Sequence, residues 1–152
     1  MKLASALNAL ESFLATLGGW LQAPLLLVLR LYWGSLFVQT GWGKLTHLGR
    51  TAGYFESLHI PLPQLNALLA GGTECFGGAL LLLGLYVRFA TPALVFTMIV
   101  AYATAEREAL AAIVSDTDKF TGAAPFLFLL VALAVFAFGP GKLSLDALLR
   151  KK

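Results

Sequence analysis

Long apolar segments recur along this chain of 152 residues, and each is close to the length that a helix needs to cross a membrane. A helix rises 1.5 Å per residue, so it needs roughly 20 residues to cross about 30 Å of hydrocarbon. The segments are Leu21–Thr40, Leu65–Tyr86, Arg88–Ala105 and Gly122–Phe138. We therefore predict an all-α fold, a transmembrane four-helix bundle, in which residues 1–152 form a single membrane domain.

The composition agrees with a membrane protein. Hydrophobic residues make up 59% of the chain and charged residues only 12%, whereas a soluble domain carries about 25% charged residues. The formal net charge of +3 needs no nucleic acid to explain it, because a basic tail that faces anionic lipid is the ordinary arrangement. The lipid bilayer is thus the first expected partner, and nucleic acid is not one.

The first twenty residues have a different pattern from the apolar segments. Leucines recur at helical spacing on one side, at Leu3, Leu7, Leu10, Leu14 and Leu17, while Asn8, Glu11 and Ser12 lie on the other. This pattern is typical of an amphipathic helix at the membrane surface, so we predict an interfacial helix over residues 1–20. A cleaved signal peptide is the alternative, although Asn8 and Glu11 interrupt its hydrophobic region.

The distribution of Lys and Arg indicates the orientation, because these residues stay preferentially in the cytoplasm. With four spans, both termini share one side. That side carries six basic residues and the opposite side four, and the basic C-terminal end, "LLRKK", favours termini inside. We predict a multi-pass protein with both termini in the cytoplasm.

Two charged residues fall inside apolar segments. Arg30 lies about ten residues into the first segment, and Glu74 lies about ten residues into the second. Because consecutive spans run antiparallel, equal depth would let Arg30 and Glu74 pair at half height. An unpaired charge at a helix centre costs about 2.5 to 3.5 kcal/mol on insertion scales, which favours pairing.

Helical spacing predicts which way these charges face. Glu74 shares a stripe with Gly71, Cys75 and Gly78, and small residues permit close helix approach. Leu27, Trp33, Gly34 and Phe37 form the matching stripe near Arg30, and Tyr102 reaches the same interior from the third span. Two readings stay open: a structural clip between helices, or the polar floor of a ligand pocket.

Other chemistry has little support in the sequence. His47 and His59 have neither a carboxylate nor a thiol at metal-ligand spacing, and no span contains a histidine to hold a haem. Cys75 is the only cysteine, so a dithiol relay would need a second protein. Lys44, one turn beyond the first apolar segment, is interpreted as a snorkelling anchor or as a residue at a pocket mouth.

Three motifs occur in a recognisable order: "LRLYWGSLFVQTGWGKL", "ECFGGALLLLGLYVRFAT" and "FGPGKLSLD". In this order and spacing, the chain resembles the DoxX family of small four-helix bacterial membrane proteins over roughly residues 22–147. By position, Arg30, Lys44 and Glu74 match the polar residues of the family. The resemblance implies a location in the bacterial inner membrane.

The resemblance also implies a membrane subunit of a redox system, because some relatives look like subunits of thiosulfate:quinone oxidoreductase or of thiol-linked assemblies. On this hypothesis the chain is an oxidoreductase subunit that acts only with a partner protein. Arg30 and Glu74 would be catalytic, and Trp33, Phe37, Lys44, Cys75 and Tyr102 would bind a quinone or a similar amphiphile. The alternatives are a non-catalytic anchor for a partner enzyme, or a carrier of a small molecule or lipid, which would need a homo-oligomer to enclose a path.

Overall fold

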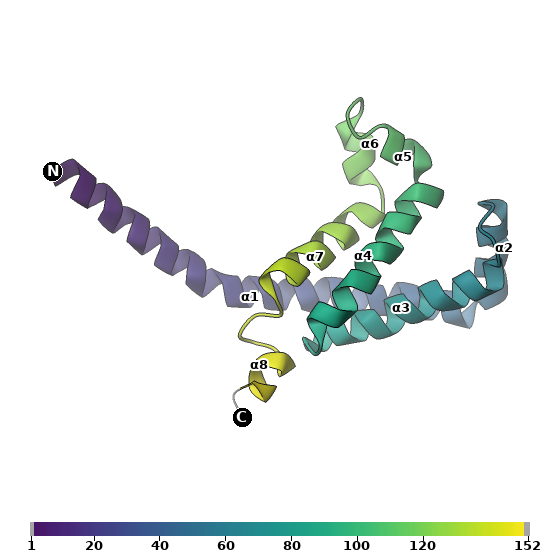
Figure 1. Cartoon of the computed structure of the whole chain (residues 1–152), viewed down its shortest axis with the longest axis horizontal. Helices are drawn as coiled ribbons and strands as arrows, with labels where there is room; N and C mark the ends of the chain where they lie inside the picture. The colour runs from purple at the N-terminus through teal and green to yellow at the C-terminus, as the bar shows by residue number, and fades with distance from the viewer. Residues whose placement is uncertain (1, 151–152) are drawn as a thin grey trace.

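The computed structural model describes residues 2–150, which are mostly helical (Figure 1). The helices are α1 (Lys2–Thr46), α2 (Leu48–Ser57), α3 (Pro63–Leu83), α4 (Val87–Thr104), α5 (Arg107–Ala111), α6 (Thr117–Gly122), α7 (Pro125–Phe138) and α8 (Leu145–Leu149). The predicted all-α class is confirmed for these residues. The four predicted spans correspond to the C-terminal part of α1 and to α3, α4 and α7.

Three helices, α1, α3 and α4, are long and apolar enough to cross a membrane. Helix α7 is more apolar than these three but has only 14 residues, which span about 21 Å. It packs against α4 and α1, and it begins beside the end of α4. It ends at Phe138, and the next residue, Gly139, lies close to Arg88 near the start of α4. The structure therefore supports three candidate spans, and a fourth crossing by α7 stays a prediction.

Helix α1 is one continuous helix of 45 residues, and its N-terminal half extends away from the other helices (Figure 1). No break separates the predicted interfacial helix from the first span, even at Gly18, Gly19 and Pro24. A separate amphipathic surface helix is thus not confirmed. At 1.5 Å per residue α1 is about 67 Å long, so part of it must leave the roughly 30 Å of hydrocarbon.

Glycines set the register in which α1 and α3 pack. A Cβ atom added at Gly34 would lie 2.8 Å from the backbone nitrogen of Leu82, and one at Gly78 would lie 2.6 Å from the Cβ of Phe37. A Cβ at Gly41 would overlap the backbone of Cys75. These contacts confirm the predicted role of small residues in close helix approach, and they fix which residues of the two antiparallel helices face each other.

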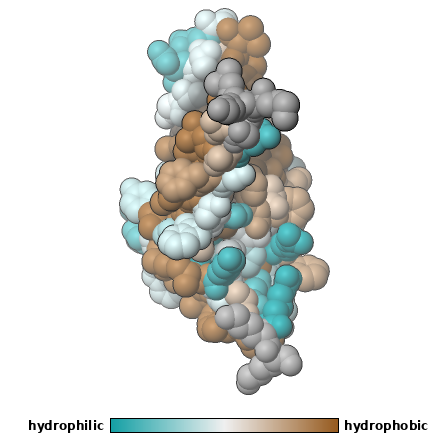
Figure 2. Space-filling view, turned by 90° about the vertical axis from the view of Figure 1, so that its left-hand side faces the viewer, coloured by the Kyte–Doolittle hydropathy of each residue, from teal (hydrophilic) through white to brown (hydrophobic). Residues whose placement is uncertain are grey.

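The apolar core lies where α1, α3, α4 and α7 meet. Its buried members are Leu26, Phe37, Leu81, Val87, Leu94, Met98, Val131, Ala132 and Val135. Many other large apolar side chains are exposed, and Figure 2 shows apolar residues over much of the face in view. An exposed apolar surface of this extent is expected for a protein whose solvent is lipid.

Candidate functional site

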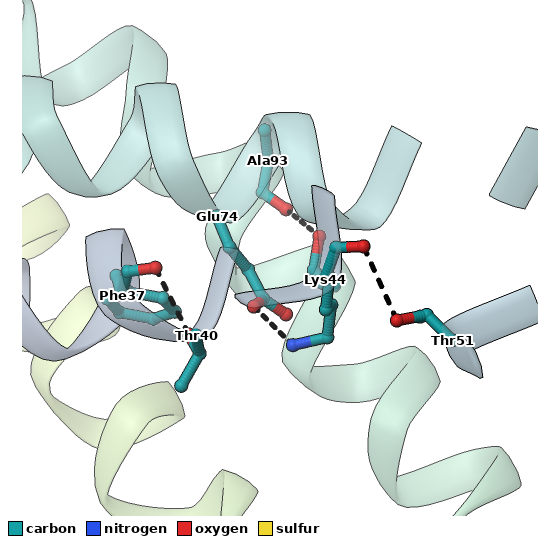
Figure 3. Close-up of polar contacts among 7 residues, drawn as sticks. Phe37, Thr40, Lys44, Thr51, Glu74 and Ala93 are labelled. Atoms are coloured by element: carbon teal, nitrogen blue, oxygen red, sulfur yellow. Dashed lines mark hydrogen bonds and ion pairs between the residues drawn. The ribbon is translucent and has the colours of Figure 1, made fainter. Parts of the chain in front are cut away.

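A partly buried ion pair joins α1 to α3. The Nζ atom of Lys44 lies 2.5 Å from Oε2 of Glu74, and the two side chains point toward each other in Figure 3. The Glu74 side chain is only 4% exposed and that of Lys44 is 28% exposed. The carboxylate is therefore held away from solvent, and the ammonium group remains reachable.

The predicted pairing of Arg30 with Glu74 is wrong. Arg30 and Lys44 are 14 residues apart on one helix, which corresponds to about 21 Å, and Glu74 pairs with the latter. The prediction took the first apolar segment, beginning at Leu21, as the span. In the structure, the part of α1 that packs against α3 lies closer to the C-terminal end of α1. The middle of α3 therefore faces Gly41 and Lys44.

Arg30 instead holds the C-terminal segment. Its Nη2 atom donates a hydrogen bond to the carbonyl oxygen of Leu143, and its Nε atom donates to the carbonyl of Leu26 at 3.3 Å. Its Nη1 atom packs against Gly84, where a Cβ atom would collide with the guanidinium group. The φ angle of Gly84 is +67°. Glycine has no Cβ atom and adopts positive φ freely, so it fits this position. Arg30 is 1% exposed, so it has no access to a ligand in this arrangement.

The segment that Arg30 holds also caps α4. The carboxylate of Asp146 accepts hydrogen bonds from the backbone N–H groups of Tyr86, at 2.9 Å, and Val87, at 3.4 Å. The N–H of Asp146 donates to the carbonyl of Gly84 at 3.0 Å. The N-terminus of α4 therefore takes its cap from a distant part of the chain. Ser144 caps α8, because its side-chain oxygen accepts a hydrogen bond from the Ala147 N–H at 3.2 Å.

The Lys44–Glu74 pair lines a cleft of about 550 Å³ between α1, α2, α3, α4 and the start of α7. Apolar side chains form most of its wall, among them Tyr54, Phe55, Leu58, Ile60, Leu69, Phe96, Met98, Val100 and Phe128. Of these, Tyr54, Leu69 and Phe96 are exposed at the protein surface, so the rim of the cleft is apolar. The shape offers an apolar space with one ion pair in its wall.

The other predicted site residues lie outside the cleft. Phe37 is fully buried, and both it and Trp33 pack edge-on against Phe128, with ring centroids 4.6 and 5.0 Å apart respectively. Cys75 is half-buried beside Gly41. These residues support the cleft wall or the contact between helices rather than line the space.

Tyr102 is also a packing residue in this structure. Its hydroxyl donates a hydrogen bond of 2.8 Å to the carbonyl oxygen of Phe120, and the two rings stack with centroids 5.0 Å apart. This contact fixes α6 against the end of α4. Of the predicted site residues, only Lys44 and Glu74 line the cleft.

Sequence reasoning missed the walls that α2 and the segment after it supply. Helix α2 packs on α3, and Tyr54, Phe55, Leu58 and Ile60 line the cleft. The available signal was the cluster of aromatic and apolar residues in a connection that also contains charged residues and glycine.

The family model for DoxX matches residues 25–107, which is more than half of the chain. The chain belongs to the DoxX family. The match covers the partly buried ion pair, the cleft walls from α1 to α4, and Arg30. Neither the comparison with curated proteins nor the comparison with solved structures found a match. Family membership and the three apolar helices place this DoxX protein in a lipid bilayer.

Proposed function

We propose that this DoxX protein is a membrane subunit of a redox system, and that it binds a quinone or a similar amphiphile in the cleft beside Lys44 and Glu74. The observation that carries the proposal is the position of this ion pair in the wall of an otherwise largely apolar cleft. Ionisable groups inside a membrane protein are rare, costly and commonly functional. The inner bacterial membrane, with both termini in the cytoplasm, is the proposed location.

The dimensions of the cleft support this proposal. A volume of about 550 Å³ falls within the roughly 300 to 1,000 Å³ of typical small-molecule sites. Such sites are lined mostly by apolar side chains, with a few polar groups that orient the ligand. Here the aromatic and aliphatic wall would hold the ring and tail, and Lys44 and Glu74 would orient the oxygen-bearing end.

The two residues have distinct roles in the proposal. A quinone becomes a quinol by taking up two electrons, here from a partner oxidoreductase, and two protons. Lys44 donates a hydrogen bond to a ring oxygen, and Glu74 is the carboxyl group that passes a proton to or from that oxygen. Arg30, which the sequence analysis paired with Glu74 as a catalytic residue, donates to the carbonyl oxygen of Leu143 instead.

Gentle purification followed by extraction and mass spectrometry tests the binding. Retention of a stoichiometric quinone or related amphiphile by the wild-type protein, and its loss in a folded Lys44→Gln/Glu74→Gln variant, is the expected result. A protein that carries no such molecule, or a double variant that retains as much of it, contradicts the proposal. Co-purifying subunits in the same spectra identify the redox partner.

A non-catalytic anchor for a partner enzyme is the second candidate. The N-terminal half of α1 favours it, because it extends away from the other helices and exposes Leu10, Phe13, Leu14, Trp20 and Leu21 (Figure 1). An anchor needs the ion pair only for folding. Partner activity per folded complex would then be unchanged by the Lys44→Gln/Glu74→Gln variant and lost when residues 2–20 are removed.

A further inference from the structure

The ion pair leaves hydrogen-bonding capacity that faces the cleft. An ammonium group has three donors, and Lys44 uses one of them, on Oε2 of Glu74. Oε1 of Glu74 accepts no hydrogen bond from the described residues. Among the described residues, Nη1 of Arg30 is the one fully buried side-chain nitrogen or oxygen atom that lacks a hydrogen-bond partner. Because Oε1 of Glu74 also lacks a partner, it is not fully buried. The pair thus presents a donor and an acceptor side by side.

The charges that line the cleft do not favour an anion. They are Lys44, with one positive charge, and Glu74 and Glu106, with one negative charge each. Lys44 is already neutralised by Glu74, so a bound anion would meet the unpaired charge of Glu106 without gaining a free cation. Repulsion of this kind is stronger in an apolar surrounding than in water.

Three of the hydroxyl groups in the cleft wall offer little to an anion either. Thr40, Thr97 and Thr104 donate to carbonyl oxygens of their own helices, at 3.0, 3.0 and 2.7 Å. Figure 3 shows the bond from Thr40 to Phe37. A hydroxyl has one donor hydrogen, so these threonines are left as acceptors. The hydroxyls of Tyr54 and Thr73, which also line the cleft, donate no hydrogen bond within the described residues and are neutral donors. Lys44 is therefore the one charged donor in the described cleft wall, and the carboxylate of Glu74 is the acceptor beside it.

From this arrangement we infer that the cleft selects uncharged amphiphiles whose polar end carries a hydroxyl group, and that it disfavours anionic amphiphiles of the same chain length. The hydroxyl donates to Oε1 of Glu74, and its oxygen accepts from Lys44. The inference rests on the proposed function, and it specifies the chemical class of ligand that the site takes.

Chain-matched photo-crosslinking probes test this selectivity. Hexadecanol and hexadecanoate, each carrying a diazirine in the tail, are added to the full-length protein in detergent at pH 8, and the labelled peptides are mapped by mass spectrometry. We expect the alcohol to label peptides from Leu65–Ala70 and Phe96–Ala101 at least about tenfold more efficiently, which corresponds to about one well-made interaction.

Two variants make the test specific to charge. Glu74→Gln removes the partner of Lys44 and leaves a free cation in the cleft, so the preference should reverse toward hexadecanoate. Glu106→Gln leaves the ion pair intact and removes the other negative charge, so the preference for the alcohol should become smaller. Because Glu106 is only half-buried, this variant also serves if Glu74→Gln fails to fold.

The outcomes separate the two proposals. Equal labelling of the cleft by both probes, or a ratio that neither variant changes, overturns the selectivity and leaves amphiphile binding standing. A preference of the wild-type protein for hexadecanoate overturns the selectivity as well. Labelling of the cleft by neither probe, together with normal labelling of the lipid-facing surface, overturns both the selectivity and the proposed function.

Discussion

The Lys44 ammonium group lies 2.5 Å from a carboxylate oxygen of Glu74, and this contact joins α1 to α3 near the middle of α3. Glu74 stands 11 residues after the start of α3 at Pro63 and 9 residues before its end at Leu83. Glu74 is therefore distant from both ends of α3, where water would compensate an isolated charge. The ion pair both fixes the register of two helices and provides the polar groups of the cleft.

Breaking the pair on one side should destabilise the protein more than neutralising both sides. Glu74→Gln and Lys44→Gln each leave one charge unpaired, and we expect each to lower the free energy of unfolding by about 3 kcal/mol. The Lys44→Gln/Glu74→Gln variant leaves no unpaired charge and should recover most of that loss. Unfolding in detergent measures the three values, and a double variant as unstable as the sum of the singles would contradict this account.

Arg30→Ala should release the C-terminal segment. The substitution removes the hydrogen bond from a charged group to the carbonyl of Leu143, and such bonds contribute about 1.5 to 3 kcal/mol. Hydrogen exchange should become faster in residues 139–149 and at the start of α4, where Asp146 caps Tyr86 and Val87. Exchange around Glu74 should be unchanged. An increase confined to α3 near Glu74 would contradict this account and support a contact between Arg30 and Glu74.

Asp146→Ala tests the cap itself. Loss of the carboxylate that accepts from the Tyr86 N–H should cost about 1 kcal/mol, as for other N-cap residues. Asp146→Asn, which keeps a side-chain oxygen, is the matched control and should cost less. If both variants unfold like the wild type, the bond does not contribute to stability.

Gly41→Ala and Gly43→Ala are a matched pair on one helix. A Cβ atom at position 41 would overlap the backbone of Cys75, so the first variant should be destabilised by about 1 to 3 kcal/mol. A Cβ atom at position 43 meets nothing within 4 Å, and the second variant should be stabilised by about 0.5 to 1 kcal/mol through helix propensity. Thermal unfolding in detergent compares them, and equal effects would contradict the packing of α1 on α3.

The exposed pair between Glu108 and Lys119 should give a small pH dependence. Its hydrogen bond of 2.9 Å lowers the pKa of Glu108 from its ordinary value and raises the pKa of Lys119. The contribution of Glu108 to stability is therefore present above its unfolded pKa, about 4.3, and is lost as the pH falls through the lower folded value. The contribution of Lys119 is present below its unfolded pKa, about 10.4, and is lost as the pH rises through the higher folded value.

The difference in melting temperature between wild type and Glu108→Gln measures this dependence. It should be small at pH 7, because both groups are exposed, and should decrease toward zero as the pH falls below about 4. A difference that grows as the pH falls would contradict the assigned direction of the Glu108 pKa.

The helices were predictable from sequence because apolar length and proline positions are local signals. The predicted segment Leu65–Tyr86 lies within three residues of the bounds of α3, Pro63 and Leu83. The stripe of small residues around Glu74 also had the predicted orientation, since Gly71, Glu74 and Gly78 are buried.

The partners of the charges were not predictable in the same way. An apolar segment shows that a helix can cross the membrane, but it does not show which part of a longer helix packs against its neighbour. The part of α1 that packs against the middle of α3 lies closer to Thr46 than the apolar segment indicated. Glu74 therefore pairs with Lys44 and not with Arg30. The contact between Arg30 and Leu143 joins residues 113 positions apart, and no periodic pattern reports it.

Titration of a short-chain quinone into the purified protein tests the central claim most directly. The claim is that Lys44 and Glu74 orient an amphiphile in the cleft, so the folded Lys44→Gln/Glu74→Gln variant should bind the quinone at least about tenfold more weakly than the wild type. The Gly43→Ala variant is the control for a neutral change on the same helix, and its affinity should equal that of the wild type. Equal affinity of the double variant and the wild type would contradict the account.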